Sequence, residues 1–270
     1  MRASTAVLVS FATLITIAPA PAAADFLFET GFERPSFVPG LLAGQDGIIA
    51  ANPSLNTDVA SIVTEFPASG VQSVRFAGDL IQKSPTSDFW AARYRPNFVY
   101  DAIGSGTPRV TLQADLALIG PATSTDLVSV NLAARDTAGR RFSEIWLSSD
   151  GTAWTVGAGA DMRTVPYLLN RFNTVTLALD FTSLTTEFFL NGTSLGTRGF
   201  GTGKGGMLIP TFSMEAVIAP TAYRAYVDDL RMSAVPEPAG LTLLVLGVLG
   251  TCGYGLCGWA GSPGKAEDLP

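Results

Sequence analysis

Apolar and polar residues alternate along several stretches of the chain between residues 70 and 232. Within residues 110–118 every even-numbered position is apolar, and three of the four positions between them are polar. Residues 128–132, 174–181 and 212–218 show the same period. Because successive side chains of a strand point to opposite faces, a period of two predicts half-buried β-strands. No amphipathic helix of any length is predicted.

Short polar sequences separate these stretches at residues 136–139, 149–151 and 191–192. The last of them is Asn-Gly, which predicts a tight β-hairpin because both residues accept a positive φ. Many short strands joined by such turns are typical of an all-β fold. We expect two antiparallel sheets packed as a jelly-roll sandwich over residues 25–232.

Residues 1–24 have the pattern of a secretory signal peptide. Arg2 supplies a positive charge, residues 6–17 form an apolar run that is short for a membrane span, and residues 22–24 are a small-residue cleavage sequence. We therefore expect export, with Asp25 as the first mature residue. The alternative is a buried N-terminal helix.

Residues 239–261 contain no charged side chain. A stretch of this length can cross a hydrocarbon core of roughly 30 Å, and a buried soluble helix would normally carry a polar stripe. We expect one C-terminal transmembrane helix, followed by a cytoplasmic tail at residues 262–270. The alternative is a buried helix of a soluble protein.

Charge and composition exclude several classes of function. The formal net charge is −6 and basic residues are mostly scattered singly, so no nucleic-acid partner is expected. The chain has no His, which removes the commonest general base and metal ligand. The two cysteines, Cys252 and Cys257, lie in the apolar C-terminal run, so the middle of the chain has no disulfide.

The linker at residues 233–238 ends in Pro236, Glu237 and Pro238. Proline fixes φ and disfavours helix in the residue before it, so Glu237 is expected on an extended segment. This motif, with the apolar run and short tail after it, resembles the PEP-CTERM sorting signal. The resemblance implies processing by a membrane exosortase that recognises Pro236, Glu237 and Pro238. The family's terminal arginine cluster is missing, and a plain anchor behind a proline-rich stalk is the alternative.

The middle of the chain resembles the concanavalin A-like and laminin-G-like jelly rolls. Residues 171–197 look like a strand with a Leu-x-Leu-Asp pattern followed by a hairpin with Leu-Asn-Gly. Residues 28–47 are similar to the start of many exported PEP-CTERM proteins of this fold. The resemblance implies a concanavalin A-like sandwich.

Acidic residues near both ends of the predicted sandwich suggest a structural calcium site. Glu33, with Glu29 as the other N-terminal candidate, and the adjacent Asp228 and Asp229 look like the pair that ties first and last strands together. Calcium prefers several oxygen ligands, including carboxylates. The alternative is that these residues are surface charges at a strand end.

Aromatic residues suggest a carbohydrate-binding platform. Trp90 and Tyr94 share one face of a predicted strand, and arginines occupy the other face. Rings with a polar rim suit stacking on sugars. Trp146 and Trp154 are further candidates. The alternative is that these rings fill the core of the sandwich.

The paired carboxylates that concanavalin-like glycosidases carry in a Glu-x-Asp-x-x-Glu arrangement are missing from the sequence. We therefore expect a protein that is not an enzyme. Its predicted role is that of an exported cell-surface or extracellular-matrix protein whose sandwich binds or embeds in polysaccharide. The alternatives are a structural surface protein without ligand specificity and a glycan-active enzyme.

Overall fold

The computed structural model divides the chain into two compact units, of which residues 23–236 form one. The described residues are 25–51, 58–83, 90–122, 127–158, 164–203, 205–217 and 219–235. The expected signal peptide, the motif Pro236 to Pro238, the expected membrane helix and the tail lie outside them. Within the described part, no helix is both long and apolar enough to span a membrane.

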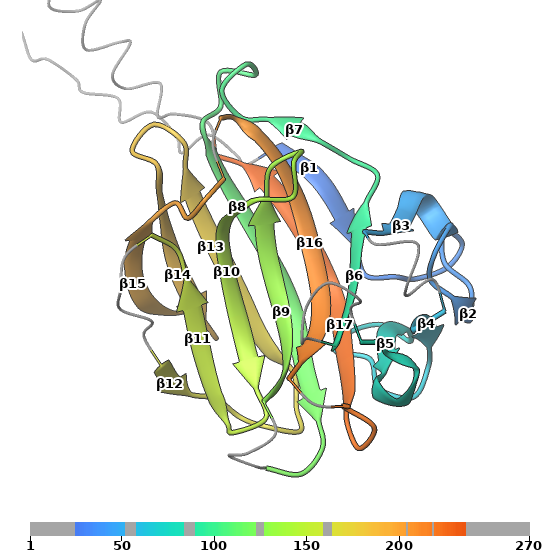
Figure 1. Cartoon of the computed structure of the whole chain (residues 1–270). Coiled ribbons are helices and arrows are strands. Elements are labelled where there is room, and N and C mark those ends of the chain that lie inside the picture. The colour runs from blue at the N-terminus through green and yellow to red at the C-terminus, as the bar shows by residue number, and fades with distance from the viewer. Residues whose placement is uncertain are drawn as a thin grey trace, which may run out of the picture. The chain divides into compact units, whose positions relative to one another are not determined.

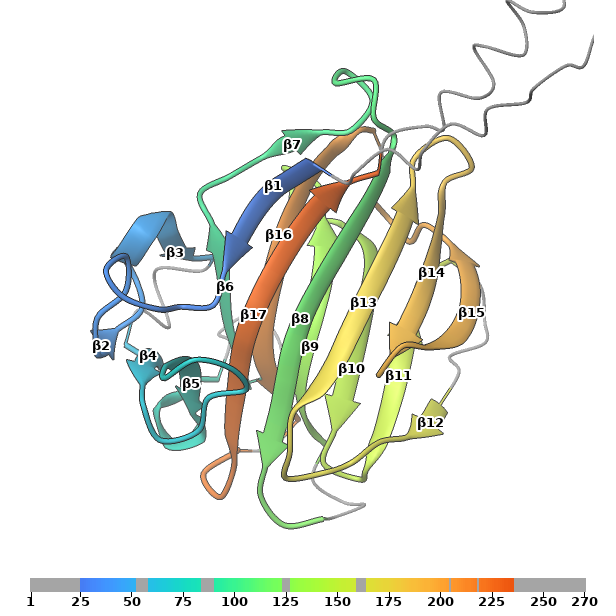
Figure 2. The ribbon, with the colours of Figure 1, turned by 180° about the vertical axis from the view of Figure 1, so that it is seen from behind.

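The described chain folds into two antiparallel sheets, which confirms the all-β sandwich (Figures 1 and 2). Sheet A contains, in spatial order, β15 (Thr193–Gly199), β14 (Thr185–Leu190), β13 (Asn173–Asp180), β8 (Arg109–Ile119), β17 (Arg224–Ala234), β5 (Ser73–Ala77), β4 (Ala60–Val63) and β2 (Gly40–Leu41), with β1 (Asp25–Thr30) also paired to β17. Sheet B contains β12 (Thr164–Pro166), β11 (Thr152–Val156), β10 (Arg141–Ser148), β9 (Val128–Arg135), β16 (Met207–Ala216), β6 (Trp90–Pro96) and β3 (Ile48–Ala50), with β7 (Tyr100–Asp101) also paired to β16. Two short 3-10 helices, η1 (Gln45–Gly47) and η2 (Gly78–Leu80), complete the described elements.

Neighbouring strands often come from distant parts of the chain. In sheet A, β8 lies between β13 and β17, and in sheet B, β9 lies between β10 and β16. The first strand pairs with the last, with Asp25 opposite Ala234. Crossovers of this kind, together with the two packed sheets, are typical of a jelly-roll sandwich.

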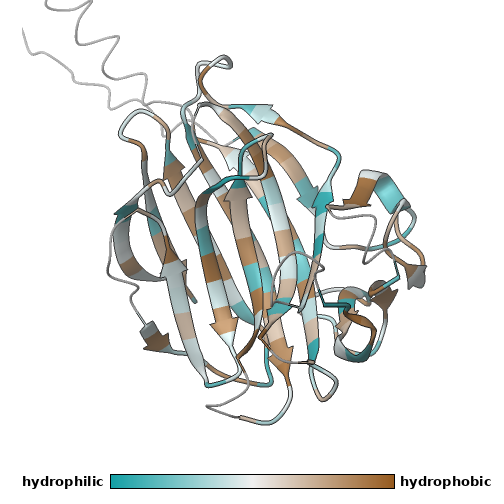
Figure 3. Cartoon of the chain, viewed as in Figure 1, coloured by the Kyte–Doolittle hydropathy of each residue, from teal (hydrophilic) through white to brown (hydrophobic). Residues whose placement is uncertain are grey.

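The core lies between the sheets and follows the period-two pattern. Along β8, Val110, Leu112 and Leu116 are buried, as are Val130 and Leu132 along β9. Figure 3 shows the matching bands of hydrophobic and hydrophilic residues along the strands of sheet B. The alternating stretches of the sequence therefore correspond to strands, as predicted.

The predicted hairpin at residues 191–192 joins β14 to β15. Asn191 and Gly192 adopt φ values of 50° and 77°, the left-handed conformation that a tight hairpin turn needs. The Asn191 Oδ1 atom also accepts a hydrogen bond from the backbone N–H of Thr174 at 2.9 Å. The hairpin prediction is confirmed, and its asparagine also ties the turn to the neighbouring strand.

Candidate functional site

The expected aromatic platform of Trp90 and Tyr94 lies on the core side of β6. Tyr94 is fully buried, with ring centroids 5.6 Å from Phe76 and 6.3 Å from Phe212. Its hydroxyl accepts a hydrogen bond from the backbone N–H of Ala60 at 3.2 Å. Trp90 is half-buried and packs against the same core. The platform prediction is therefore wrong. Tyr94 packs in the core and has no face open to a sugar, and Trp90 lies on the same side of the strand.

The expected calcium ligands Glu33 and Asp228 both hold the loop before β5. Glu33 Oε1 accepts hydrogen bonds from the backbone N–H groups of residues 71 and 72 at 2.7 and 2.8 Å. Asp228 Oδ2 accepts from residues 68 and 69 at 2.8 and 3.2 Å. The two carboxylates therefore fix a loop by satisfying its backbone donors.

Asp229 and Glu29 are held by Arg231 instead. Asp229 adopts a φ of 47° at a β-bulge that follows Asp228, which turns its side chain out of the strand alternation. Arg231 lies 2.8 Å from Glu29 and 3.6 Å from Asp229. Across the described ranges, no group of three or more acidic, Cys or His side chains is arranged to hold a metal ion. The described carboxylates are therefore held by backbone N–H groups or by Arg231, and the calcium site stays a prediction.

A row of aromatic and polar side chains crosses the face of sheet B that is turned away from the core. Strand register places Trp154 opposite Trp146, Trp146 opposite Asn131, Asn131 opposite Ser213, and Ser213 opposite Arg93. We call these five residues the central row. It runs across β11, β10, β9, β16 and β6, with aromatic rings at one end and a positive charge at the other.

The same alternation that builds the core puts polar residues on this outer face. In β9 the core takes Val130 and Leu132, so Asn131 points the other way. In β16 the core takes Phe212 and Met214, which leaves Ser213 outside. Asn131 and Ser213 are nevertheless both 0% exposed.

A β-bulge in β10 brings two charged residues onto the outer face. The register shifts between Arg141 and Ser143, so Phe142 and Ser143 are both buried. The next residue, Glu144, then returns to the face of Arg141, three positions earlier. A regular strand would have put these two residues on opposite faces.

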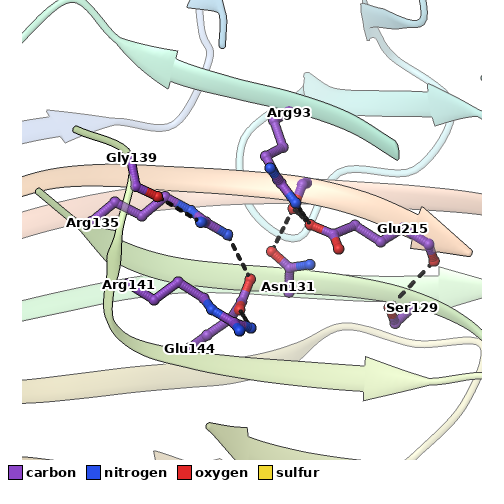
Figure 4. A network of polar contacts seen from close by, with 9 residues as sticks. Arg93, Ser129, Asn131, Arg135, Gly139, Arg141, Glu144 and Glu215 are labelled. Atoms are coloured by element: carbon purple, nitrogen blue, oxygen red, sulfur yellow. Dashed lines mark hydrogen bonds and ion pairs between the residues drawn. The ribbon is translucent and has the colours of Figure 1, made fainter. Parts of the chain in front are cut away.

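Three arginines and two glutamates form an ion-pair network around the central row (Figure 4). Arg135 Nη2 lies 3.2 Å from Glu144 Oε1, and Arg141 Nη1 lies 2.9 Å from Glu144 Oε2. Arg93 donates from Nε and Nη2 to Glu215 Oε1 at 2.9 and 2.8 Å. Glu144 is fully buried, so the two guanidinium groups compensate a charge that water does not reach.

Burial shifts the ionisation of this network. It raises the pKa of the Glu144 carboxyl, and the nearby Glu215 carboxylate raises it further. It also lowers the pKa of the Arg135 guanidinium, while the Glu144 charge opposes that change. Of these two groups, Arg135 lines the hollows described below, and Glu144 lies buried against it.

Three adjoining hollows lie over this network. The tryptophan hollow has a volume of about 220 Å³ and is lined by Trp146, Trp154 and Glu215, among others. The arginine hollow, of about 330 Å³, shares Trp146 and Glu215 and adds Arg93, Arg135 and Arg141. A third hollow, of about 290 Å³, extends from Arg93 and Arg135 to Arg95.

Three hydrogen-bond donors of this face have no partner among the described residues: Asn131 Nδ2, Arg135 Nε and Trp146 Nε1. Asn131 is oriented by its other end, because Oδ1 accepts a bond from Ser213 Oγ at 2.5 Å. Buried polar groups are normally satisfied, and each exception calls for an explanation. A ligand with acceptor oxygens would supply one.

Sequence reasoning found Trp146 and Trp154 but missed Asn131, Glu144 and Glu215. The available signal was the polar side of the alternating strands, which was read as solvent-facing. No pattern in the sequence indicates that β6, β9, β10 and β16 are neighbours, since that order depends on the crossovers.

The sequence matches no protein-family model and has no significant match among curated proteins. Among solved structures, a carbohydrate esterase from the Shiga toxin-encoding bacteriophage phi24B is similar, with a TM-score of 0.52 and 10% identity over 78% of this chain and 99% of that one. Lectin II from Ulex europaeus has a TM-score of 0.47 and 12% identity over 79% and 99% of the two chains. The GH131 β-glucanase catalytic domain from Podospora anserina has a TM-score of 0.46 and 13% identity over 64% and 78%. At these identities the similarity is one of fold.

The expectation that the chain is not an enzyme is wrong. The carbohydrate esterase shares the fold with a TM-score of 0.52, so the fold is one that also occurs in a glycan-active enzyme. The expectation relied on one carboxylate spacing within a single strand. The structure instead brings Glu144 and Glu215 onto one face from two different strands.

Proposed function

We propose that the outer face of sheet B binds a polysaccharide along the central row. The observation that carries this proposal is the combination of Trp146 and Trp154 with a buried polar network on one open face. Carbohydrate sites commonly pair aromatic rings, which stack on the apolar face of a sugar, with a few fixed polar groups that set its orientation. The coarse fold agrees, since it is shared with a lectin and with glycan-active enzymes.

We assign stacking to the tryptophan end of the central row and hydrogen bonding to the arginine end. Trp146 and Trp154 offer ring surface beside the tryptophan hollow. Arg93 with Glu215 offers charged hydrogen-bonding groups that line the arginine hollow, next to the buried pair of Asn131 and Ser213. Rigid strands hold all of these groups, which limits the entropy lost on binding.

Binding of the full chain to a glycan panel tests this proposal. We expect Trp146→Ala and Trp154→Ala each to weaken binding by about tenfold or more, which corresponds to about 1.4 kcal/mol. Phe26→Ala is the matched control, because Phe26 is an exposed aromatic on sheet A. Its substitution is expected to leave binding unchanged. If the folded wild type binds no glycan, or if Phe26→Ala weakens binding as much, the proposal fails.

Cleavage of the bound glycan is a second candidate function. Glu215 lines both the tryptophan and arginine hollows, and the described hydrogen bonds to its side chain all end on Oε1. Glu215 is therefore the carboxylate placed to contact a bound glycan, whereas Glu144 is fully buried and ion-paired to Arg135 and Arg141. Release of new chain ends from bound glycans tests this candidate. Glu215→Gln should abolish the release while the protein still binds, and a wild type that releases none contradicts cleavage.

We infer separately that the protein is exported and held at the cell surface or in the extracellular matrix. The support is in the sequence: residues 1–24 resemble a signal peptide, and Pro236, Glu237 and Pro238 precede the uncharged run 239–261. An exosortase-type enzyme and the membrane are the partners that this inference requires. Intact mass spectrometry of the cell-associated protein tests it. Loss of residues 1–24 and of the chain beyond the motif is expected, and a full-length mass would contradict it.

A further inference from the structure

The outer face of sheet B is positively charged although the chain as a whole has a net charge of −6. Four arginines line its hollows, Arg93, Arg95, Arg135 and Arg141. Two glutamates, Glu144 and Glu215, oppose them, which leaves an excess of positive charge on the face. The adjoining Arg140 and Asp136 form a pair at 2.8 Å and cancel each other.

Arg95 differs from the other three arginines of this face. Each of the others makes an ion pair with Glu144 or Glu215. Arg95 lines the third hollow beside Arg93 and Arg135, and no residue within the described ranges pairs with it. Its guanidinium is therefore the group best placed to take an anion from outside the protein.

The polar atoms of this face that have no described partner also favour an anionic ligand. Arg135 Nε and Trp146 Nε1 belong to residues that line the arginine hollow, and both are donors, so a ligand that reached them would have to present acceptor oxygens. A neutral sugar hydroxyl can accept one such bond but also brings a donor of its own. A carboxylate brings only acceptors, and its planar geometry matches a guanidinium fork.

We propose that this face selects acidic polysaccharides, whose sugars carry a carboxylate, with Arg95 as a specificity-determining residue. The proposal rests on the glycan binding proposed above. The carboxylate lies in the arginine-lined hollows, while the sugar ring stacks against Trp146. Recognition of this kind weakens with salt, because the charges are partly exposed to solvent.

The test compares two polymers that differ only in the charged group. Sodium polygalacturonate and its carboxyl-reduced form are titrated into the full chain by calorimetry at low and high salt. We expect the acid form to bind about tenfold tighter at low salt. Arg95→Gln should remove most of that difference without changing binding of the reduced polymer. Arg224→Gln, which replaces an exposed arginine of sheet A, is the matched control and should change neither.

The possible outcomes separate the two proposals. Equal binding of both polymers overturns the acidic selectivity and leaves glycan binding standing. Equally tight binding of dextran sulfate also overturns it, since the face would then be a general polyanion surface. If the folded wild type binds neither polymer nor any other glycan, both proposals fail. An unchanged preference in Arg95→Gln removes Arg95 from its assigned role.

Discussion

Asp228 shows how the structure gives a carboxylate a role that its sequence context did not indicate. It is fully buried and accepts backbone hydrogen bonds from residues 68, 69 and 229. Burial raises its pKa to about 6, although these three hydrogen bonds favour the charged form and oppose the shift. The desolvation of the carboxylate is thus only partly offset.

This shift predicts a pH dependence of stability. A carboxyl whose pKa is higher in the folded state stabilises the fold at low pH, and the contribution is lost as pH rises through the folded value. Between about pH 4 and 6, Asp228 should therefore reduce the free energy of unfolding by about 2 to 3 kcal/mol. Thermal melts of the wild type and Asp228→Asn across this range measure it, and we expect a flatter profile in the variant.

Parallel profiles for the wild type and Asp228→Asn would contradict the assignment of the pH dependence to Asp228.

The effect of added calcium on the melting temperature is a second measurement on the same two proteins. Because Glu33 and Asp228 already accept backbone hydrogen bonds, we expect calcium to leave the melting temperature unchanged. A calcium-dependent rise that Asp228→Asn abolishes would restore the ligand role expected from the sequence.

Tyr94 shows that the alternation of apolar and polar residues predicts which residues share a face, but not which face is buried. The pattern correctly separates Tyr94 from Arg93 and Arg95 onto opposite faces of β6. It does not say which face is buried, because aromatic rings serve equally in a core and at a sugar site. Contact with Phe76 and Phe212 from other strands decides the question, and those contacts are long-range.

Among the elements, β10 contributes most to the site through its bulge. Buried Phe142 and Ser143 hold the strand from the core side, where the hydroxyls of Ser143 and Thr186 form a hydrogen bond. Arg141 and Glu144 consequently share the outer face. A period-two pattern predicts strands well, but it cannot predict where the alternation is interrupted.

Glu144→Leu is expected to destabilise the protein by about 3 to 5 kcal/mol, because it leaves the buried Arg135 charge without its partner. The double variant Arg135→Met with Glu144→Leu should recover much of that loss, since no uncompensated charge then remains. Urea unfolding measures both. Glu187→Leu, at a half-buried position on sheet A, is the control for a change of the same type. A small effect of Glu144→Leu, or an additive double variant, would contradict the network.

For the whole molecule, the sequence was sufficient to predict the sandwich but not the site. The strands and turns are encoded locally, by alternation and by pairs such as Asn191 and Gly192. The central row runs from Trp154 to Arg93 and depends on the crossovers that place β11, β10, β9, β16 and β6 side by side. No local pattern encodes that order, so Asn131, Glu144 and Glu215 could be recognised only from the fold.

The most direct test of the account is a crystal structure of the full chain with a bound oligosaccharide, such as a polygalacturonate oligomer. We predict a sugar ring stacked against Trp146, with acceptor oxygens within hydrogen-bonding distance of the arginines that line the hollows. An oligosaccharide bound elsewhere, on sheet A or at a sheet edge, with the central row unoccupied, would contradict the account.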